Sequence, residues 1–499
     1  MATIYNDATV QQVNETLVQS WNAYRQFRKL DLKERAAFLK AIANEITGTS
    51  NELIAVANSE TNLGKARLAT ELKRTIFQLN SYADACAEGT WLDIRIDTAD
   101  PNRNPPKPDL RKMLVPLGPV VVFGASNFPF AYSTAGGDTA CALAAGCSVI
   151  IKAHPAHAQT SDLVAEAVKR AAGKCNLPKA VFIHLHGASF EVGKALVQHP
   201  LTKAVGFTGS FEGGKALFDI ANQRKEPIPV CAEMGSVNPV FILPQQLKND
   251  TTGIATMCAN SITQSAGQFC TNPGIVVAIE DESLDAFEKI LEQQIKRTRP
   301  EKMLHPGIAK SFIQKRERAL AEQTVEVGAT TEFEAGENES IPTVAKVAAK
   351  VFLKNSVLHQ EVFGPFSLLV KCSDVDELIK VAAEIEGQLT CSLIATEDEV
   401  KNNLELIETL KDKCGRFVVN GVPTGVEVAL SMHHGGPYPA TTDSRFTSVG
   451  ADGIKRFARP ICFQNWNNEL LPVELKNENP LKLWRTVNNE LTKNPLATI

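Results

Sequence analysis

Hydrophobic residues recur in helical steps along roughly the first ninety positions. In residues 33–46 apolar side chains stand three or four positions apart, and the same spacing continues in residues 51–58 and 68–87. This periodicity predicts amphipathic helices, which form either a bundle or one flank of an α/β domain. A polar segment with four prolines, residues 97–109, interrupts the pattern. Because proline disrupts helices and central strands, we expect an exposed arm or an edge hairpin there.

Short apolar runs alternate with helical patterns from residue 120 onward. The runs predict strands at 120–123, 148–152, 180–185, 203–207 and 228–231. The stretches between them predict helices at 134–145, 160–172, 190–198 and 213–222. This alternation is typical of βαβ units and a parallel sheet, in which ligands bind at the carboxyl ends of the strands.

A second run of strands and helices begins near residue 235. Its first part predicts helices at 252–264 and 284–296 and a strand at 274–279. After a weaker middle stretch, further elements are expected at 351–353, 366–370, 375–383, 391–395, 400–410 and 417–420. The segment after residue 464 is polar and rich in asparagine, with one apolar, helix-like piece at 481–491.

Composition narrows the functional class. The 499 residues suggest two to four domains at about 150 residues each. The 52 basic and 56 acidic residues give a net charge of −4 without any basic block, so we expect no nucleic-acid partner. No apolar run approaches the roughly 20 residues of a membrane helix, and the N-terminus lacks a signal-peptide pattern. Eleven scattered cysteines, without zinc-type spacing, predict reduced thiols in the cytoplasm and no metal site.

Individual motifs are ambiguous by themselves. No Gly-x-Gly-x-x-Gly fingerprint follows the strand at 120–123, but a glycine-rich turn at 207–214 opens a helix and could hold a phosphate, or be a simple βα turn. Cys270 lies among small residues in a turn. It is either a nucleophile or an ordinary buried thiol. Glu233 ends an apolar strand, at a surface or in a cleft. Asn127 and Glu361 could equally be turn residues.

Six of these features occur together in the order and approximate spacing of the aldehyde dehydrogenase superfamily. They are Gly-Ala-Ser-Asn-Phe-Pro at 124–129, Lys152, Phe-Thr-Gly-Ser at 207–210, Glu-Met-Gly at 233–235, Gly-Gln-Phe-Cys at 267–270 and Glu-Val-Phe-Gly-Pro at 361–365. The resemblance extends from about residue 10 to about residue 465. The string at 432–441 and the segments at 151–155 and 236–239 resemble a narrower branch, which holds α-ketoglutaric semialdehyde (2,5-dioxopentanoate) dehydrogenases and NADP-dependent long-chain aldehyde dehydrogenases.

The resemblance implies an α/β fold with a Rossmann-like cofactor domain, an α/β catalytic domain and a small oligomerisation arm. It implies a cofactor domain of residues 1–97 and 117–234 and a catalytic domain of residues 235–445. Residues 98–116 and 446–499 would form the bridging segments and the C-terminal tail of a homodimer or homotetramer.

The resemblance also implies a reaction. Cys270 would attack the aldehyde as a thiolate, and Asn127 with the backbone N–H of Cys270 would stabilise the oxyanion. Glu233 would activate water to hydrolyse the resulting thioester, which argues against transfer to coenzyme A. A cofactor-independent cysteine hydrolase or acyltransferase is the alternative of a different class, but no histidine neighbours Cys270 in the sequence.

For the cofactor, the resemblance implies NAD(P), held by Lys152, His154, Pro155, Gly209, Ser210, Glu361 and Phe363. Many NAD-specific relatives have an acidic residue three positions after the lysine, where this chain has Pro155. Since no carboxylate at that position would repel a 2′-phosphate, and Lys152, His154 and Lys215 could attract one, we expect NADP to be preferred and NAD to be accepted.

For the substrate, the branch implies 2,5-dioxopentanoate, which would be oxidised to 2-oxoglutarate. Its far-end carboxylate needs a cation, and Arg445, near His433 and His434, is the candidate by family analogy, although it could equally be a surface residue. A medium- or long-chain aliphatic aldehyde, which needs an apolar tunnel, is the alternative. Phe128 and Phe269 could line the pocket for either substrate.

Overall fold

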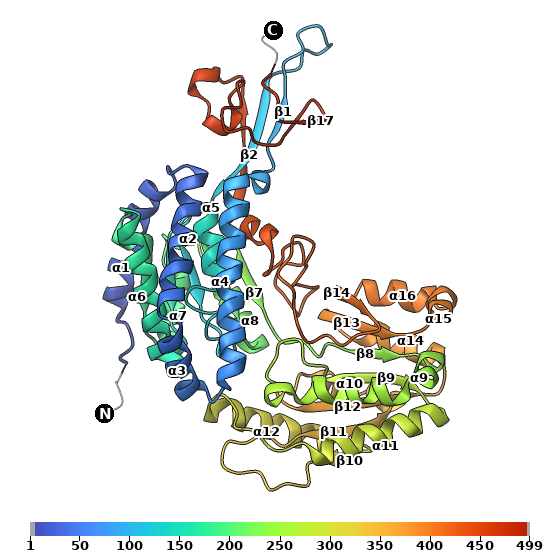
Figure 1. The fold of residues 1–499 in the computed structure, drawn as a ribbon. Coiled ribbons are helices and arrows are strands. Elements are labelled where there is room, and N and C mark those ends of the chain that lie inside the picture. The colour runs from blue at the N-terminus through green and yellow to red at the C-terminus, as the bar shows by residue number, and fades with distance from the viewer. Residues whose placement is uncertain (1–4, 497–499) are drawn as a thin grey trace.

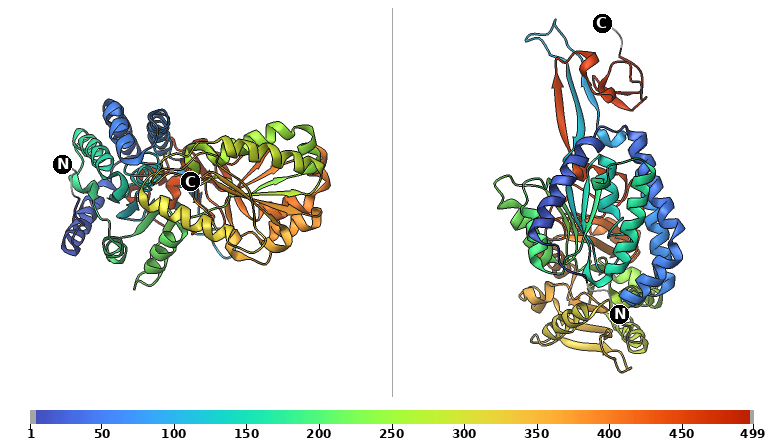
Figure 2. Two further views of the ribbon diagram at one scale, coloured as in Figure 1. Left: turned by 90° about the horizontal axis from the view of Figure 1, so that it is seen from below. Right: turned by 90° about the vertical axis from the view of Figure 1, so that its left-hand side faces the viewer.

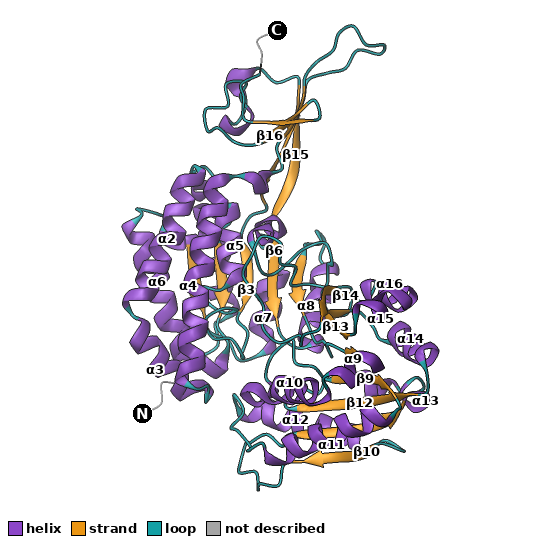
Figure 3. Cartoon of the chain, turned by 45° about the vertical axis from the view of Figure 1, so that its right-hand side comes forward, coloured by secondary structure: helices purple, strands orange, loops and turns teal. Residues whose placement is uncertain are grey.

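Two layered α/β bodies and a projecting arm make up the protein (Figure 1). The structure is a computed structural model that describes residues 5–496. Each body is built on its own sheet, with helices packed on both faces, as the purple helices around the orange strands show in Figure 3. This arrangement confirms the predicted α/β fold class.

The first body holds a five-stranded parallel sheet of order β5-β4-β3-β6-β7. Its strands are β3 (Val120–Phe123), β4 (Val149–Lys152), β5 (Phe182–Leu185), β6 (Ala204–Thr208) and β7 (Val230–Glu233). Its helices are α1 (Val10–Phe27), α2 (Leu32–Gly48), α3 (Ser50–Thr61), α4 (Lys65–Glu88), α5 (Gly137–Ala145), α6 (Ala158–Lys174), α7 (Phe190–Gln198) and α8 (Phe211–Asn222).

Side chains of β3 show how two cores form on opposite faces of this sheet. Val120 and Val122 pack into the core made with α2, α4, α5 and α6, whereas Val121 and Phe123 pack into the core made with α1, α7 and α8. Successive residues of a strand point to opposite faces, so a fully apolar strand requires helices on both sides.

The second body holds a seven-stranded sheet of order β10-β11-β12-β9-β8-β13-β14, in which only the β10–β11 pair is antiparallel. Its strands are β8 (Val240–Ile242), β9 (Ile275–Ile279), β10 (Glu326–Thr330), β11 (Thr343–Ala348), β12 (Phe366–Cys372), β13 (Gln388–Ile394) and β14 (Cys414–Val419). Its helices are α9 (Pro244–Asn249), α10 (Thr251–Thr263), α11 (Glu282–Arg297), α12 (Pro306–Leu320), α13 (Ala349–Phe352), α14 (Val375–Glu384), α15 (Glu397–Asn402) and α16 (Leu404–Lys411).

The arm is a third sheet of order β15-β2-β1-β16-β17, which extends away from both bodies (Figure 2). It contains β1 (Arg95–Asp97), β2 (Leu110–Pro116), β15 (Ala458–Gln464), β16 (Arg485–Val487) and β17 (Glu490–Thr492). The proline-rich residues 98–109 form its tip, where Asp100 and Lys107 make an isolated bridge. The predicted exposed arm is therefore present, and it includes β1, which the predicted boundaries assign to the cofactor domain.

Short 3₁₀ helices lie between these elements: η1 (Thr90–Leu92), η2 (Pro155–His157), η3 (Lys179–Val181), η4 (Gln264–Gly267), η5 (Ser356–His359), η6 (Ala451–Phe457), η7 (Asn468–Leu470) and η8 (Val473–Leu475). Ile454 and Phe457 of η6 pack into a core of the first body. This part of the predicted bridging segment 446–499 therefore lies against the first body rather than in the arm. Among residues 5–496 no helix is long and apolar enough to cross a bilayer.

Several element predictions were wrong in detail. The helix-like piece at 481–491 forms β16 and β17, because Asn488 and Asn489 both have positive φ and make the two-residue turn of a hairpin. The helix expected from residue 134 begins only at Gly137, since residues 130 and 131 are held in a loop by the carboxylate of Glu71. Helix α12 lies in the weak middle stretch, where the sequence predicted no element.

Candidate active site

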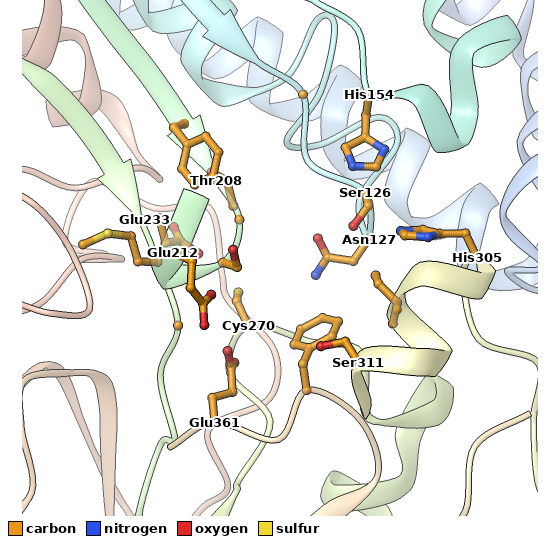
Figure 4. A pocket seen from close by; sticks show the side chains of 18 of the residues that line it. Ser126, Asn127, His154, Thr208, Glu212, Glu233, Cys270, His305, Ser311 and Glu361 are labelled. Atoms are coloured by element: carbon orange, nitrogen blue, oxygen red, sulfur yellow. The ribbon is translucent and has the colours of Figure 1, made fainter. Parts of the chain in front are cut away.

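A cavity of about 440 Å³ lies where the loops after β3, β6 and β7 meet the second body (Figure 4). Within the first sheet, β3 has β4 as one neighbour and β6 as the other, so the strand order reverses at β3. The carboxyl end of β3 is therefore the topological switch point of this parallel sheet. The first body contributes residues 124, 126, 127, 154, 207–210, 212 and 233–235 to its wall. The second body contributes residues 270, 305, 308, 311, 315, 361 and 363.

Cys270 reaches this cavity because the chain turns sharply just before it. Ser265, Ala266 and Gly267 have φ values of 51°, 53° and 64°, so three successive residues are left-handed between α10 and β9. The turn is fixed by Asn238, whose side-chain Nδ2 donates to the carbonyl of Cys270 at 2.8 Å. Cys270 is partly exposed, unlike the fully buried thiol that the alternative interpretation required.

Glu233 and His434 converge on the Cys270 thiol. Glu233 is the last residue of β7 and only 4% exposed, and its Oε1 lies 3.1 Å from Nε2 of His434. The same Nε2 lies 3.7 Å from Sγ of Cys270. The hydroxyl of Ser448 donates to Oε2 of Glu233 at 2.9 Å. The three side chains therefore form a cluster, buried at Glu233 and His434 and partly exposed at Cys270, in which a thiol, an imidazole and a carboxylate lie close together.

This cluster shifts the acidity of its members in opposite directions. Burial, followed by the Glu233 carboxylate, raises the pKa of the Cys270 thiol well above its ordinary value. Burial alone would raise the pKa of Glu233, but His434 and the hydrogen bonds from His434 and Ser448 outweigh it, and the net pKa is lowered. Glu233 is therefore ionised at neutral pH, whereas most of the thiol is protonated until a base removes its proton.

Asn127 lies beside the same thiol, in the loop that follows β3. Its Nδ2 donates to the carbonyl of Gln268 at 3.2 Å, which fixes the amide next to the Cys270 turn. Its backbone carbonyl accepts from the guanidinium of Arg67 at 2.8 Å. Figure 4 shows the amide directed toward the cavity, close to Cys270. The structure thus brings together all three predicted catalytic residues, Cys270, Glu233 and Asn127.

Five of the seven predicted cofactor residues line the cavity: His154, Gly209, Ser210, Glu361 and Phe363. Ser210 is the N-cap of α8, where its hydroxyl accepts from the N–H of Gly213 at 3.2 Å. A Cβ at Gly209 would stand 2.6 Å from the Phe207 ring, so glycine lets the turn pack closely against that ring. Burial raises the pKa of Glu361 to about 7. Pro155 is exposed, and neither it nor Lys152 lies in the cavity wall.

The charges that the structure places around Lys152 differ from those that the sequence predicted. Burial and the neighbouring His157, Lys152 and His305 lower the pKa of His154 well below its ordinary value, so His154 is neutral. Lys215 is paired with Asp219 at 2.6 Å. Asp7 bonds to the N–H groups of residues 188 and 189 and lies close enough to Lys152 to interact with its charge. A carboxylate is therefore present near Lys152, although the sequence has none at position 155.

A second cavity, of about 470 Å³, opens on the other side of Cys270. Phe128 and Phe269 line it in an edge-to-face pair, with ring centroids 5.7 Å apart. Arg67 and Arg74 of α4 also line it, and the guanidinium carbon of Arg67 lies 4.8 Å from the centroid of Phe269. The Nε and Nη1 atoms of Arg67 and the Nε of Arg74 are buried without a hydrogen-bond partner among the described residues.

Arg445, by contrast, lies away from both cavities that Cys270 lines. Its side chain is 78% exposed and paired with Asp443. The predicted substrate-binding role of Arg445 therefore does not agree with the structure, because the loop that carries Arg445 directs it to solvent. The cations beside the second cavity are Arg67 and Arg74, which sequence reasoning missed because α4 showed only an ordinary amphipathic pattern.

Comparison with known proteins agrees with this geometry. The chain matches the aldehyde dehydrogenase family over residues 1–457. It is 46% identical over 490 residues to α-ketoglutaric semialdehyde dehydrogenase 2 of Azospirillum brasilense, covering 97% of this chain and 92% of that protein. It is 42% identical to α-ketoglutaric semialdehyde dehydrogenase of Acinetobacter baylyi, covering 98% and 93%.

The fold is also similar to solved structures. Glyceraldehyde-3-phosphate dehydrogenase of Methanocaldococcus jannaschii, solved in complex with NADP, superimposes with a TM-score of 0.77 at 18% identity, covering 93% of this chain and 96% of that one. With a family match over most of its length and two near full-length relatives above 40% identity, this chain belongs to the aldehyde dehydrogenase family, which uses NAD(P).

Proposed function

We propose that the protein oxidises 2,5-dioxopentanoate to 2-oxoglutarate with NAD(P), by hydrolysis of a thioester on Cys270. The two close relatives are named as α-ketoglutaric semialdehyde dehydrogenases. The observation that carries the substrate assignment is the pair of partly buried arginines, Arg67 and Arg74, in the cavity on the far side of Cys270.

The arginine pair favours a substrate with a carboxylate at its far end. Arg67 and Arg74 are seven residues apart on α4, which is about two turns, so both lie on the same helix face. Guanidinium N–H groups that are buried without partners are costly, and a carboxylate satisfies them with charge-assisted hydrogen bonds. A purely aliphatic chain would leave these groups unsatisfied. A long-chain aldehyde is therefore the weaker candidate, although Phe128 and Phe269 supply some apolar wall.

The proposed first step is thiol addition to the aldehyde carbon. As the thiol attacks, its proton passes to solvent in the cavity, and the Nε2–H of His434, which donates to the ionised Glu233 and lies 3.7 Å from Sγ, is placed to stabilise the thiolate. As the S–C bond forms, charge develops on the aldehyde oxygen, where the Asn127 amide and the Cys270 N–H can donate. Each such donor typically contributes about 3 kcal/mol to the transition state.

The proposed second step is hydrolysis of the thioester. A water molecule between Glu233 and the acyl carbon loses a proton to the carboxylate while its oxygen attacks the carbon. The lowered pKa of Glu233, which burial would otherwise raise, keeps the carboxylate ionised for this role. The thioester bond breaks, the thiol of Cys270 is regenerated and the acid product dissociates, so the site can bind another substrate.

The first cavity fits a dinucleotide. It lies at the strand switch point, it has the N-terminus of α8 at one side, and the glycine-rich turn at Gly209 forms part of its wall. We propose that Ser210 and Gly209 hold the pyrophosphate, that Glu361 binds the hydroxyls of the ribose inside the cavity, and that Phe363 packs near the nicotinamide end. Lys152, which lies outside the cavity wall, would bind the hydroxyls of the second ribose. When bound, the cofactor supplies the hydride acceptor.

The arm supports a proposed homodimer or homotetramer. Trp466, Leu470, Trp484 and Leu491 are large apolar residues of the arm region, and each is at least 41% exposed. Exposed apolar groups on a projecting sheet are typical of a surface that is covered by another chain. All eleven cysteines are free, which suits the proposed cytoplasmic location.

The test of the substrate assignment compares 2,5-dioxopentanoate with pentanal and dodecanal. We expect kcat/KM to be highest for 2,5-dioxopentanoate. Replacing Arg67 or Arg74 by Met should lower that value by about 30-fold or more, mostly through KM, with little change for pentanal. Arg445→Met serves as the matched control and should change neither value. A higher kcat/KM for dodecanal than for 2,5-dioxopentanoate would contradict the assignment.

A further inference from the structure

The cluster of Cys270, His434 and Glu233 contains the three kinds of ligand that zinc prefers. A thiolate sulfur, an imidazole nitrogen and a carboxylate oxygen lie within 4.8 Å of one another in it. The residues are 37 and 164 positions apart along the chain, so no sequence spacing reveals the set. Three protein ligands with a fourth position open to solvent or substrate are typical of accessible zinc sites.

The distances fit a tetrahedral ion. Zinc bonds of about 2.3 Å to sulfur and about 2.1 Å to nitrogen and oxygen place the S and N ligands about 3.6 Å apart and the N and O ligands about 3.4 Å apart. The structure has 3.7 Å between Sγ of Cys270 and Nε2 of His434. It has 3.1 Å between Nε2 of His434 and Oε1 of Glu233. The third pair, Sγ of Cys270 and a carboxylate oxygen of Glu233, lies within 4.8 Å, against about 3.6 Å in a tetrahedral site, so side-chain shifts of up to about 1 Å close it.

The charges and the surroundings also fit. A thiolate, a carboxylate and a neutral imidazole balance the two positive charges of Zn²⁺, so the occupied site is neutral in its buried setting. Ser448 donates to Oε2 of Glu233 and holds the carboxylate in position, whereas Oε1, which accepts from Nε2 of His434, is freed for the ion when the imidazole proton moves to Nδ1 and Nε2 binds the metal. Cys270 lines both cavities, so an ion can enter from either side.

We propose that Cys270, His434 and Glu233 form a Zn²⁺ site and that its occupancy reversibly switches the enzyme off. On binding, the S–H bond breaks, the Zn–S bond forms and the proton leaves to the solvent, without any redox change. The ion then occupies the lone pairs of the sulfur, the imidazole and the carboxylate together. The metal site depends only on the placement of the three side chains, whereas the inhibition rests on the proposed function of Cys270.

A second group of potential zinc ligands lies at the end of β5, and zinc bound there must be distinguished from zinc bound at Cys270. Asp162, His184 and His186 have ligand atoms within the same 4.8 Å, but they are only partly buried and lack a thiol. His186→Gln removes a ligand from this surface group without touching the cavities. This variant is therefore the background in which the cluster at Cys270 is measured.

The experiment titrates metal-free His186→Gln protein with Zn²⁺ in competition with a chromophoric chelator. We expect one tight equivalent, and about a hundredfold weaker binding when His434→Gln or Cys270→Ser is added. Co²⁺ should give a sulfur-to-metal charge-transfer band in the His186→Gln protein and none with Cys270→Ser. Thermal unfolding of each variant checks that it folds.

Activity distinguishes the two parts of the proposal. Dehydrogenase activity of the His186→Gln enzyme should fall as the first equivalent of Zn²⁺ binds and should return on addition of EDTA. Equal Zn²⁺ affinity in folded His434→Gln and in its parent would overturn the metal site. Full activity with one equivalent of Zn²⁺ on Cys270 would leave the metal site standing, and would overturn both the switch and the proposed role of Cys270.

Discussion

Glu233 shows how the surroundings of one side chain decide its chemistry. A carboxyl group that is 4% exposed would ordinarily be protonated at neutral pH, because burial disfavours its charge. His434 and Ser448 reverse this effect by bonding to both oxygens, and the net pKa is lowered. The sequence indicates only an acidic residue after an apolar strand, whereas the partners come from residues about 200 positions later.

Replacing Glu233 by Gln should separate the two proposed steps. The amide fills the same space but cannot accept a proton from water, so acylation should continue while hydrolysis stalls. We expect one equivalent of reduced cofactor in a rapid burst, followed by a steady rate lowered about 10²–10⁴-fold. Stopped-flow absorbance measures both phases. An unchanged steady rate would show that another base acts in hydrolysis.

The raised pKa of Glu361 predicts a pH dependence of cofactor binding. The carboxyl group titrates at about pH 7, so it is mostly protonated below that pH and ionised above it. The ionised form accepts hydrogen bonds from ribose hydroxyls on both oxygens. The dissociation constant for the cofactor should therefore fall as pH rises through 7 and then level off. Fluorescence titration should find this slope absent in Glu361→Gln, whereas a persistent slope would assign the titration to another group.

Asp7 should influence the choice between NADP and NAD. Its carboxylate lies close enough to Lys152 to interact with its charge, so it should oppose a 2′-phosphate on the ribose that Lys152 is proposed to bind. Asp7→Asn should raise the ratio of kcat/KM for NADP to that for NAD by about threefold or more, and added salt should reduce the difference. Asp84→Asn on α4, which breaks an ion pair with Lys40 of α2, is the control. An unchanged ratio for Asp7→Asn would mean that Asp7 does not face the cofactor.

At the scale of elements, two loops fix each other beside the active site. The turn before Cys270 contacts the segment before β12, where Asn272 donates to the carbonyl of Gly364 at 2.9 Å. Gly267 has a φ of 64°, and a Cβ there would stand 2.3 Å from the carbonyl carbon of Gly364. Cys270 and Glu361 thus hold their relative positions because two backbones approach more closely than any side chain allows.

Gly267→Ala should therefore damage both stability and activity. The left-handed backbone and the clash with Gly364 should lower the free energy of unfolding by about 2–4 kcal/mol. Gly173→Ala in α6, which meets nothing within 4 Å, is the matched control and should raise stability by about 0.5–1 kcal/mol. Urea denaturation measures both variants. Equal stability of Gly267→Ala and the parent would show that the two loops can separate at little cost.

Local patterns predicted the elements wherever burial alone determines them. The strands of the first sheet and helices α2, α3, α4, α6, α7 and α8 lie close to the predicted ranges. The predictions failed where another part of the chain decides the structure. The segment before α5 stays in a loop because Glu71 accepts from the N–H groups of residues 130 and 131. Residues 481–491 form a hairpin whose strand β16 pairs with the edge of β1.

For the whole molecule, the arm is the feature that solution measurements test most directly. Leu470 and Leu491 are 70% and 67% exposed there. If another chain covers them, Leu470→Asp with Leu491→Asp should reduce the assembly to a 54.2 kDa monomer. Light scattering coupled to size exclusion measures the mass, and cofactor binding should persist. Val10→Asp, at an exposed position on α1, is the control. A parent protein of monomer mass would contradict the proposed assembly.

The residues of the active site come together only when the two bodies of the chain are folded against each other. Glu233 ends a strand of the first body, Cys270 precedes a strand of the second, and His434 comes from the loop after β14 that returns to the first body. The absence of a histidine near Cys270 in the sequence argued against a cysteine hydrolase, yet folding places a histidine at the thiol. Membership of the aldehyde dehydrogenase family, rather than that absence, decides between these classes.

The sequence by itself determined the layered α/β architecture and the order of the motifs, because apolar periodicity and short motifs are local properties of the chain. Through its resemblance to a family pattern it also predicted Cys270, Glu233 and Asn127 as the catalytic residues. Only the tertiary structure decided that His434 meets the thiol, that Arg67 and Arg74 replace Arg445 beside the second cavity, and that Asp7 lies near Lys152. Those contacts join residues from 60 to more than 160 positions apart along the chain. Tertiary packing brings such residues together, and no local spacing pattern reveals them.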